Sequence, residues 1–166
     1  ITLSAVYAQL VMKFTTAQTI TLILVVNITA AIGAFVFGYV QDRLGHKKTL
    51  ALTILLWIIM GVMAAFSHGP VSFWIAANIA GIAMGSSQSA GRAVVAVFAP
   101  AGELAQFYSA WNVAVWGANV LGPITYGTVT WLTSGDQRTA ILVTTLFFVI
   151  GLLILRRVHL PSKTVC

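Results

Sequence analysis

The chain has 166 residues, of which 59% are hydrophobic and 7% are charged, and its formal net charge is +6. Because soluble domains carry about 25% charged residues, this composition excludes an ordinary soluble protein and predicts an integral membrane protein. The basic residues lie mainly at the ends of apolar runs, where they set membrane topology, so the positive charge does not predict nucleic-acid binding.

The apolar runs predict one transmembrane domain over 1–166. A helix needs about 20 apolar residues to cross a bilayer, and the runs are continuous instead of alternating as strands do. The predicted fold is therefore an all-α, polytopic membrane helix bundle. The stretch 1–12 is expected to be the end of a partial first span. Five full transmembrane helices are predicted at 19–40, 49–66, 73–99, 107–132 and 139–155, joined by short loops that contain glycine or proline.

The charged segment 41–48, between the first two full spans, is predicted to be a hinge loop. If the spans alternate in direction, most Lys and Arg residues fall on the side of this loop, which the positive-inside rule assigns to the cytoplasm together with the C-terminus. In a bacterium the membrane would then be the inner one. The residues on the loop side are Arg43, Lys47, Lys48, Arg156, Arg157 and Lys163, and those on the other side are Lys13 and Arg138.

Small residues recur every four positions in three of the spans, a spacing that lets helices approach closely in lipid. These three helices are therefore expected to pack tightly together. The alternative is that Gly and Ala are simply common in membrane helices. The stripes are Ala30, Ala34 and Gly38; Ala77, Gly81, Gly85, Ser89 and Ala93; and Ala110, Ala114, Ala118 and Gly122.

Arg92 is a charged residue deep within a predicted span, and an intramembrane charge is a functional hypothesis by default. Gln88 precedes it by one turn and extends a polar seam along the same helix. Arg92 is a candidate for binding an anionic group such as a carboxylate. The alternative is a structural role, in which Arg92 snorkels to the interface or pairs with a loop carboxylate.

The span 107–132 carries a polar and aromatic face opposite its alanine stripe. This face includes Asn112, Trp116 and Asn119 and is typical of a helix that lines a cavity. The alternative is that the asparagines only bond neighbouring helices. Pro123 is expected to kink the helix and to permit gating. Asn27 is a further polar residue within a span that is a candidate for the solute pathway.

The sequence contains no pattern that predicts a cofactor, a metal site or an enzyme. The histidines, His46, His68 and His159, fall in predicted loops or tails, and Cys166 is the one cysteine. Haem ligation within the membrane and a cysteine-built metal site are therefore unsupported. No nucleophile and base pair or phosphate-binding loop is present.

The hinge pattern G-x-x-x-D-R-x-G-x-K-K resembles the loop signature of the major facilitator superfamily, found between the second and third helices of each six-helix half. His46 departs from that signature, where a basic residue is usual. The matching residues are Gly38, Asp42, Arg43, Gly45, Lys47 and Lys48.

Later motifs look like the C-terminal half of one branch of that superfamily, the vacuolar amino-acid effluxers linked to autophagy and their bacterial relatives. The resemblance runs from the end of helix seven to helix twelve. It is carried by Gly81-x-x-x-Gly85-Ser-Ser-Gln88-Ser-x-x-Arg92, Pro100, Phe107-Tyr108, Leu121-Gly122-Pro123 and Arg138.

The resemblance implies half of a carrier that moves a small solute, such as an amino acid or another small organic anion, by alternating access. It also implies that Asp42 engages a helix N-terminus or an arginine of the opposite half. That half would come from the rest of the carrier, a second copy or another membrane subunit. Two alternatives are a non-transporting scaffold within a larger membrane complex and a redox subunit, the latter disfavoured by the loop histidines.

Overall fold

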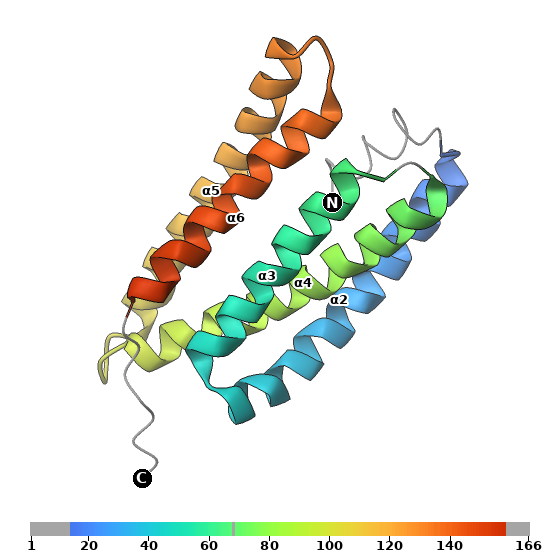
Figure 1. The fold of residues 1–166 in the computed structure, drawn as a ribbon. Coiled ribbons are helices and arrows are strands. Elements are labelled where there is room, and N and C mark those ends of the chain that lie inside the picture. Colours follow the sequence, from blue (N-terminus) through green and yellow to red (C-terminus); the bar gives the residue numbers. More distant parts are fainter. Residues whose placement is uncertain (1–13, 68, 159–166) are drawn as a thin grey trace.

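The computed structural model describes residues 14–67 and 69–158, and within them the protein consists of five α-helices joined by short connections (Figure 1). This confirms the all-α class. The predicted partial span at 1–12, and Lys13, His68, His159, Lys163 and Cys166, lie outside the described residues. The helices are α2 (Thr16–Leu44), α3 (His46–Ala65), α4 (Pro70–Phe98), α5 (Leu104–Leu132) and α6 (Gln137–Arg157).

Three of the described helices, α2, α3 and α6, are long and apolar enough to cross a membrane. The expectation of five full spans is therefore met in part. Helices α4 and α5 have 29 residues each, which is sufficient length. They also carry the polar residues that the sequence singles out, among them Gln88, Arg92, Asn112 and Asn119, and these lower their hydropathy.

The helix ends follow from local sequence. Thr15 caps α2 through a reciprocal capping box with Gln18, and Pro70 occupies the start of α4, where its missing amide hydrogen costs nothing. The connection expected over 41–48 is much shorter in the structure, because α2 continues to Leu44 and α3 begins at His46. The single residue between them, Gly45, has a φ of 82°, which glycine adopts without the steric cost of a Cβ atom.

Helices α2 and α4 form the most extensive helix pair of the described structure. Glycine makes this possible, since a Cβ atom added to Gly85 would lie 1.8 Å from the carbonyl oxygen of Ala30. Gly33 meets the backbone of Ile82 in the same way, at 2.7 Å, and Gly81 meets that of Val26 at 2.6 Å. Without a hydrophobic effect between helices in lipid, such close backbone approach is a main source of packing energy.

Helices α5 and α6 lie side by side as a pair, and α6 also packs along α3, a member of the group formed by α2, α3 and α4 (Figure 1). The main contact between the two groups is made by α3 and α6. There the rings of Trp57 and Phe148 stack with centroids 5.1 Å apart, and Gly61 leaves room for the Thr145 side chain. The α5–α6 pair is therefore joined to the remainder chiefly through α6.

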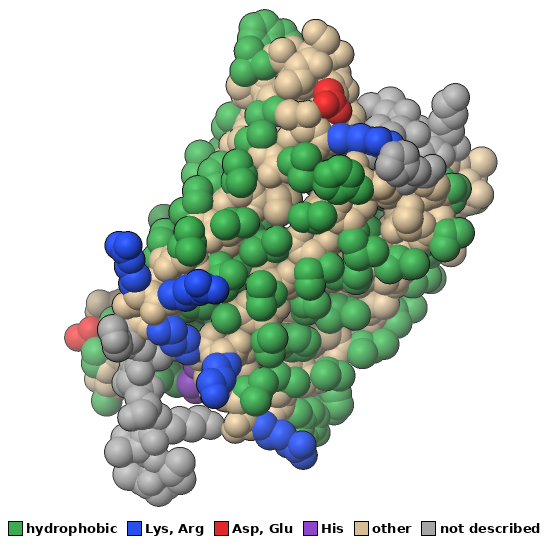
Figure 2. Space-filling view, viewed as in Figure 1, with side chains coloured by type: hydrophobic (Ala, Val, Ile, Leu, Met, Phe, Trp, Pro, Cys, Tyr) green, Lys and Arg blue, Asp and Glu red, His purple; other side chains and the backbone are tan. Residues whose placement is uncertain are grey.

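Most of the basic residues visible in Figure 2 lie at one end of the molecule. Lys47, in the first turn of α3, donates hydrogen bonds to the carbonyl oxygens of Arg156 and Val158 at the end of α6. The start of α3 and the end of α6 therefore lie together, as the alternating directions of the predicted spans require. Arg138 lies at the start of α6, at the opposite end of that helix, where it bonds the carbonyl of Ser67.

Candidate functional site

Arg92 and Gln88 line the same open pocket, with a volume of about 550 Å³, between α2, α4 and α5. Both side chains are exposed. They lie one helical turn apart on α4, so the predicted polar seam opens onto this pocket. The remaining lining residues are Ala34 of α2, Gly85, Ser89 and Ala93 of α4, and Tyr108 of α5.

Ala34 and Gly85 are small residues of α2 and α4 that line this pocket. The absence of a side chain at Gly85 allows the close approach to Ala30 of α2 described above. The guanidinium group of Arg92 and the amide of Gln88 are thus carried by α4, which packs closely against α2, and not by a loop. Such a surface presents several hydrogen-bond donors to an anionic or carboxylate-bearing molecule.

Tyr108 lines the pocket, although the sequence singles it out only as part of the Phe107-Tyr108 motif. Its hydroxyl donates a hydrogen bond of 3.1 Å to the carbonyl oxygen of Arg92. Close by, Gly91 of α4 lies 3.2 Å, measured from an ideal Cβ position, from the indole ring of Trp111. These contacts tie the start of α5 to α4. The Phe107-Tyr108 pair marks this segment in the sequence, but only the fold brings Tyr108 to Arg92.

The other candidate pathway residues do not join Arg92 and Gln88. Asn112, Trp116 and Asn119 are exposed on α5 and line neither described pocket; 72% of Trp116 is accessible. Asn27 is exposed on α2, and its side-chain amide donates to the carbonyl of Ile23 in its own helix, at 2.7 Å. Among the described residues, no helix covers the polar face of α5.

A second, larger cavity of about 590 Å³ lies between the α5–α6 pair and the other three helices. Its wall is almost entirely apolar. The side of α5 that faces it bears Ala118, Leu121 and Gly122, which include part of the alanine stripe, and Tyr126 bonds Gln137 of α6 beside it. The stripe of α5 thus borders a cavity, whereas the stripes of α2 and α4 meet each other.

The remaining residues predicted to pack helices differ in their surroundings. Ser89 lines the Arg92 pocket, Ala114 and Pro123 are exposed on α5, and α5 continues as one helix through Pro123. A Cβ atom added to Gly38 or Gly122 would meet nothing within 4 Å. Gly38 therefore leaves open space on α2 instead of making close contact.

Within the hinge segment 41–48, Gln41 is a buried residue near the end of α2. Its side-chain amide donates to Nδ1 of His46, at 2.6 Å, and lies 3.5 Å from the carbonyl of Ala90 on α4. One glutamine thus connects both sides of the Gly45 turn to α4. Asp42, Arg43 and Lys48 are exposed around it.

No group of three or more His, Cys, Asp or Glu residues that could hold a metal ion occurs within 14–67 and 69–158. The described chemistry is that of a polytopic membrane protein with an arginine-bearing pocket and a charged hinge.

Comparison with known proteins identifies the class. Residues 1–165 match the family described as "Vacuole effluxer Atg22 like". The "Uncharacterized MFS-type transporter YxiO" of Bacillus subtilis is 28% identical over 143 residues, 86% of this chain and 33% of that protein. The "Putative metabolite transport protein" of Haemophilus influenzae is 33% identical over 133 residues, 78% of this chain and 32% of that protein. No solved structure matches.

These matches define a multi-pass integral membrane protein of the major facilitator type, a transporter class and not an enzyme. The chain belongs to the Atg22-like vacuole effluxer family. This confirms the resemblance carried by the hinge and the later motifs. The chain spans about a third of the length of the two relatives.

Proposed function

We propose that this chain forms half of a carrier that moves a small organic solute across the membrane by alternating access. All five described helices, including the more polar α4 and α5, would cross the bilayer. The end that carries Lys47, Lys48, Arg156 and Arg157, and the C-terminus with it, would face the cytoplasm. The other half would come from the remainder of the carrier, a second copy or another membrane subunit.

The observation that carries the proposal is the pocket in which Arg92 and Gln88 are exposed together. Charged groups within a transporter's helices are costly in lipid and are retained where they contact water or substrate. A planar guanidinium binds a carboxylate through two parallel hydrogen bonds. The solute is accordingly an amino acid or another small organic anion, in keeping with the words "effluxer" and "metabolite transport" in the names of the matches.

The exposed face of α5 supports the same proposal. Asn112, Trp116 and Asn119 are polar or amphipathic groups on one side of a long helix, uncovered among the described residues. A second half placed against this side would enclose them with Arg92 and Gln88 in one aqueous pathway between the halves, where substrate sites of such carriers lie. Asn27 of α2 would border the same pathway.

The hinge would set the access state. Gln41 contacts His46 beyond the Gly45 turn and Ala90 of α4, the helix that bears Arg92, so a shift of the hinge would be transmitted to the pocket. Asp42, exposed at the end of α2 beside Arg43 and Lys48, would contact the opposite half in one state only. Gly38 would leave space for that contact.

The test uses the complete carrier in proteoliposomes, with uptake of a panel of amino acids and small carboxylates. We expect Arg92→Ala to raise the KM for the transported anion by about ten- to a hundredfold, the effect of losing one charged hydrogen-bonding group. Arg92→Lys keeps the charge without the two-pronged geometry and should fall between the two. Equal melting temperatures of the three proteins show that folding is unaffected. Unchanged uptake and KM in Arg92→Ala would assign Arg92 a structural role.

A further inference from the structure

The hinge has a histidine where the major facilitator signature usually has a basic residue. His46 is the first residue of α3 and follows directly on Gly45, whose φ of 82° forms the turn out of α2. Histidine changes charge between about pH 5 and 8, whereas lysine and arginine stay charged throughout this range. The charge at this position of the hinge can therefore vary with pH.

The hydrogen bonds of Gln41 indicate that His46 is neutral in this structure. The side-chain nitrogen of Gln41 lies 2.6 Å from Nδ1 of His46 and 3.5 Å from the carbonyl oxygen of Ala90 on α4. An amide nitrogen carries two hydrogens, so it can donate to both groups at once. Nδ1 is then an acceptor, and the one proton of the neutral imidazole is on Nε2. In this form Gln41 links the Gly45 turn to α4.

Protonation of Nδ1 is incompatible with this pair of hydrogen bonds. An imidazolium ion has a donor on each nitrogen and no acceptor. To accept from Nδ1, the amide of Gln41 must turn its oxygen toward His46, and this rotation takes the amide nitrogen away from the Ala90 carbonyl. Gln41 can thus bond neutral His46 together with α4, or the imidazolium without α4. Because Gln41 is only 4% exposed, water has little access to replace the lost bond.

The burial of the second ring nitrogen acts in the same direction. Nε2 of His46 is buried and has no hydrogen-bond partner within 14–67 and 69–158. A buried charge without a partner costs more free energy than a buried neutral group. The imidazolium is therefore more stable with its ring turned toward water, which moves the start of α3 away from Gln41.

The charged and titratable groups on the helix ends that meet here are mostly cationic. They oppose a further positive charge on His46, with Asp42 and Glu103 as the acids among the described residues. The others are Arg43 on α2, Lys47 and Lys48 on α3, Arg92 on α4, Tyr108 on α5, and Arg156 and Arg157 on α6.

We propose that the contact of Gln41 with His46 and Ala90 is a pH-sensitive latch of the hinge. Neutral His46 holds the Gly45 turn to α4 through Gln41, and protonated His46 releases the turn. Since α4 also bears Arg92, acid on the hinge side would free the hinge from the helix that lines the pocket. The link to the access state rests on the proposed function, whereas the latch is measured without any transported solute.

The test is hydrogen–deuterium exchange of the purified complete carrier in detergent, measured by mass spectrometry on a peptide that covers 41–50. His46→Asn keeps an acceptor near the position of Nδ1 and does not titrate, whereas His46→Arg is a cation at every pH. At about pH 8 we expect the wild type and His46→Asn to exchange equally. At about pH 5.5 the wild type should exchange about fivefold faster than His46→Asn, the effect of losing one hydrogen bond. His46→Arg should exchange fast at both.

Proteins are compared at one pH at a time, so the pH dependence of the exchange chemistry cancels. The control is the peptide across the connection between α5 and α6, at the other end of α6, which should exchange alike in all three proteins. Equal melting temperatures of wild type and His46→Asn at about pH 8 show that the fold is kept. Equal exchange of these two in acid, or slow exchange of His46→Arg in base, would overturn the latch. An increase of the same size in the control peptide would also overturn it, because the release would not be local.

Discussion

At the scale of single residues, the packing of α2 against α4 depends on positions without a side chain. Gly85 lies so close to the backbone of Ala30 that a methyl group at Gly85 overlaps the carbonyl oxygen, which cannot rotate away as a side chain would. Gly151 on α6 has open space around the same position. The sequence places Gly85 in a small-residue stripe, and the structure shows which backbone that stripe meets.

We therefore expect Gly85→Ala to destabilise the carrier by about 1–3 kcal/mol, the usual cost of overpacking, because α2 and α4 must separate. Gly151→Ala is the matched control and should leave the melting temperature unchanged or slightly higher. Thermal unfolding of the two purified variants in one detergent measures both effects. Equal melting temperatures would mean that α2 and α4 do not meet as closely as the structure has them.

At the scale of helices, the N-cap residue of α6 is Asp136, and its negative charge contributes to the stability of the fold. The hydroxyl of Thr139 and then the backbone amide of Arg138 donate hydrogen bonds to the Asp136 carboxylate and lower the pKa of Asp136 below its ordinary value of 3.8. A negative charge at a helix N-terminus is also stabilised by the helix dipole. Asp136 lies in the connection before α6, outside the predicted span 139–155.

Since its pKa is lower in the folded protein, ionised Asp136 stabilises the fold above pH 3.8, and this contribution is lost as the pH falls through the lowered value. We expect Asp136→Ala to lower the melting temperature at pH 7 and to approach the wild type in strong acid. Asp136→Asn is the control, because asparagine still caps a helix but does not titrate. Thermal unfolding from pH 7 downward measures the difference. A constant gap between Asp136→Ala and wild type at every pH would contradict the role of the charge.

At the scale of the whole molecule, the α5–α6 pair is held to the other three helices mainly by the contact of α6 with α3. The large apolar cavity lies beside this contact, so few other groups join the two parts. The stacked rings of Trp57 and Phe148 are its aromatic component.

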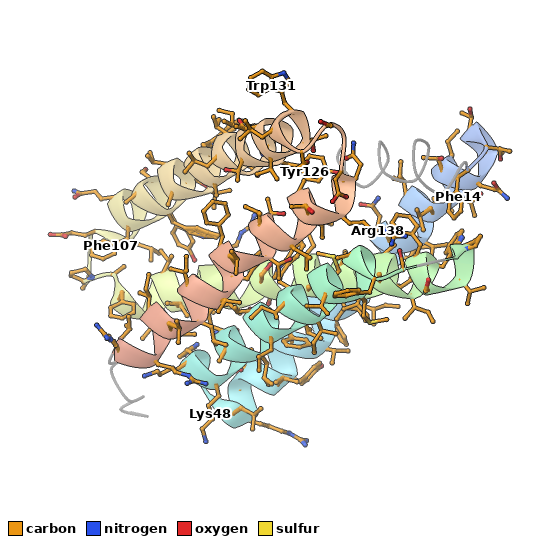
Figure 3. The ribbon with its side chains drawn as sticks, turned by 45° about the horizontal axis from the view of Figure 1, so that its top comes forward. Phe14, Lys48, Phe107, Tyr126, Trp131 and Arg138 are labelled. Carbon is orange, nitrogen blue, oxygen red and sulfur yellow. The ribbon has the colours of Figure 1, made fainter. Side chains whose placement is uncertain are left out.

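Trp57→Ala is therefore expected to destabilise the carrier, because it removes the stacked ring pair. Ring stacking alone contributes about 0.5–1.5 kcal/mol beyond the burial of apolar area, so the total loss should exceed this contribution. Trp131→Ala is the control, since Trp131 is 80% exposed and projects outward at the end of α5 (Figure 3). Thermal unfolding compares the two losses. A loss in Trp131→Ala as large as that in Trp57→Ala would indicate that the α3–α6 contact is not the joint between the two parts.

The amino-acid sequence predicted the helical class, the approximate helix bounds and the gathering of cations at one end. It did so because apolar run length and charge position act locally along the chain. It also predicted that Arg92 and Gln88 share a face, since residues four apart on a helix always do. The grouping of Arg92 with Tyr108 depends on how α4 and α5 cross, which no local pattern specifies.

The small-residue stripes show where sequence and tertiary structure divide. By itself the sequence determined which helix faces can approach closely, because a side chain's size is fixed by its residue type. Only the fold decided that Gly81 and Gly85 meet α2, while Ala118 and Gly122 border a cavity. The physical reason is that lipid solvates an apolar helix face as well as another helix does. The packing partner of a helix is therefore determined by how well two helix surfaces fit together. A small-residue stripe in the sequence describes only one of these two surfaces.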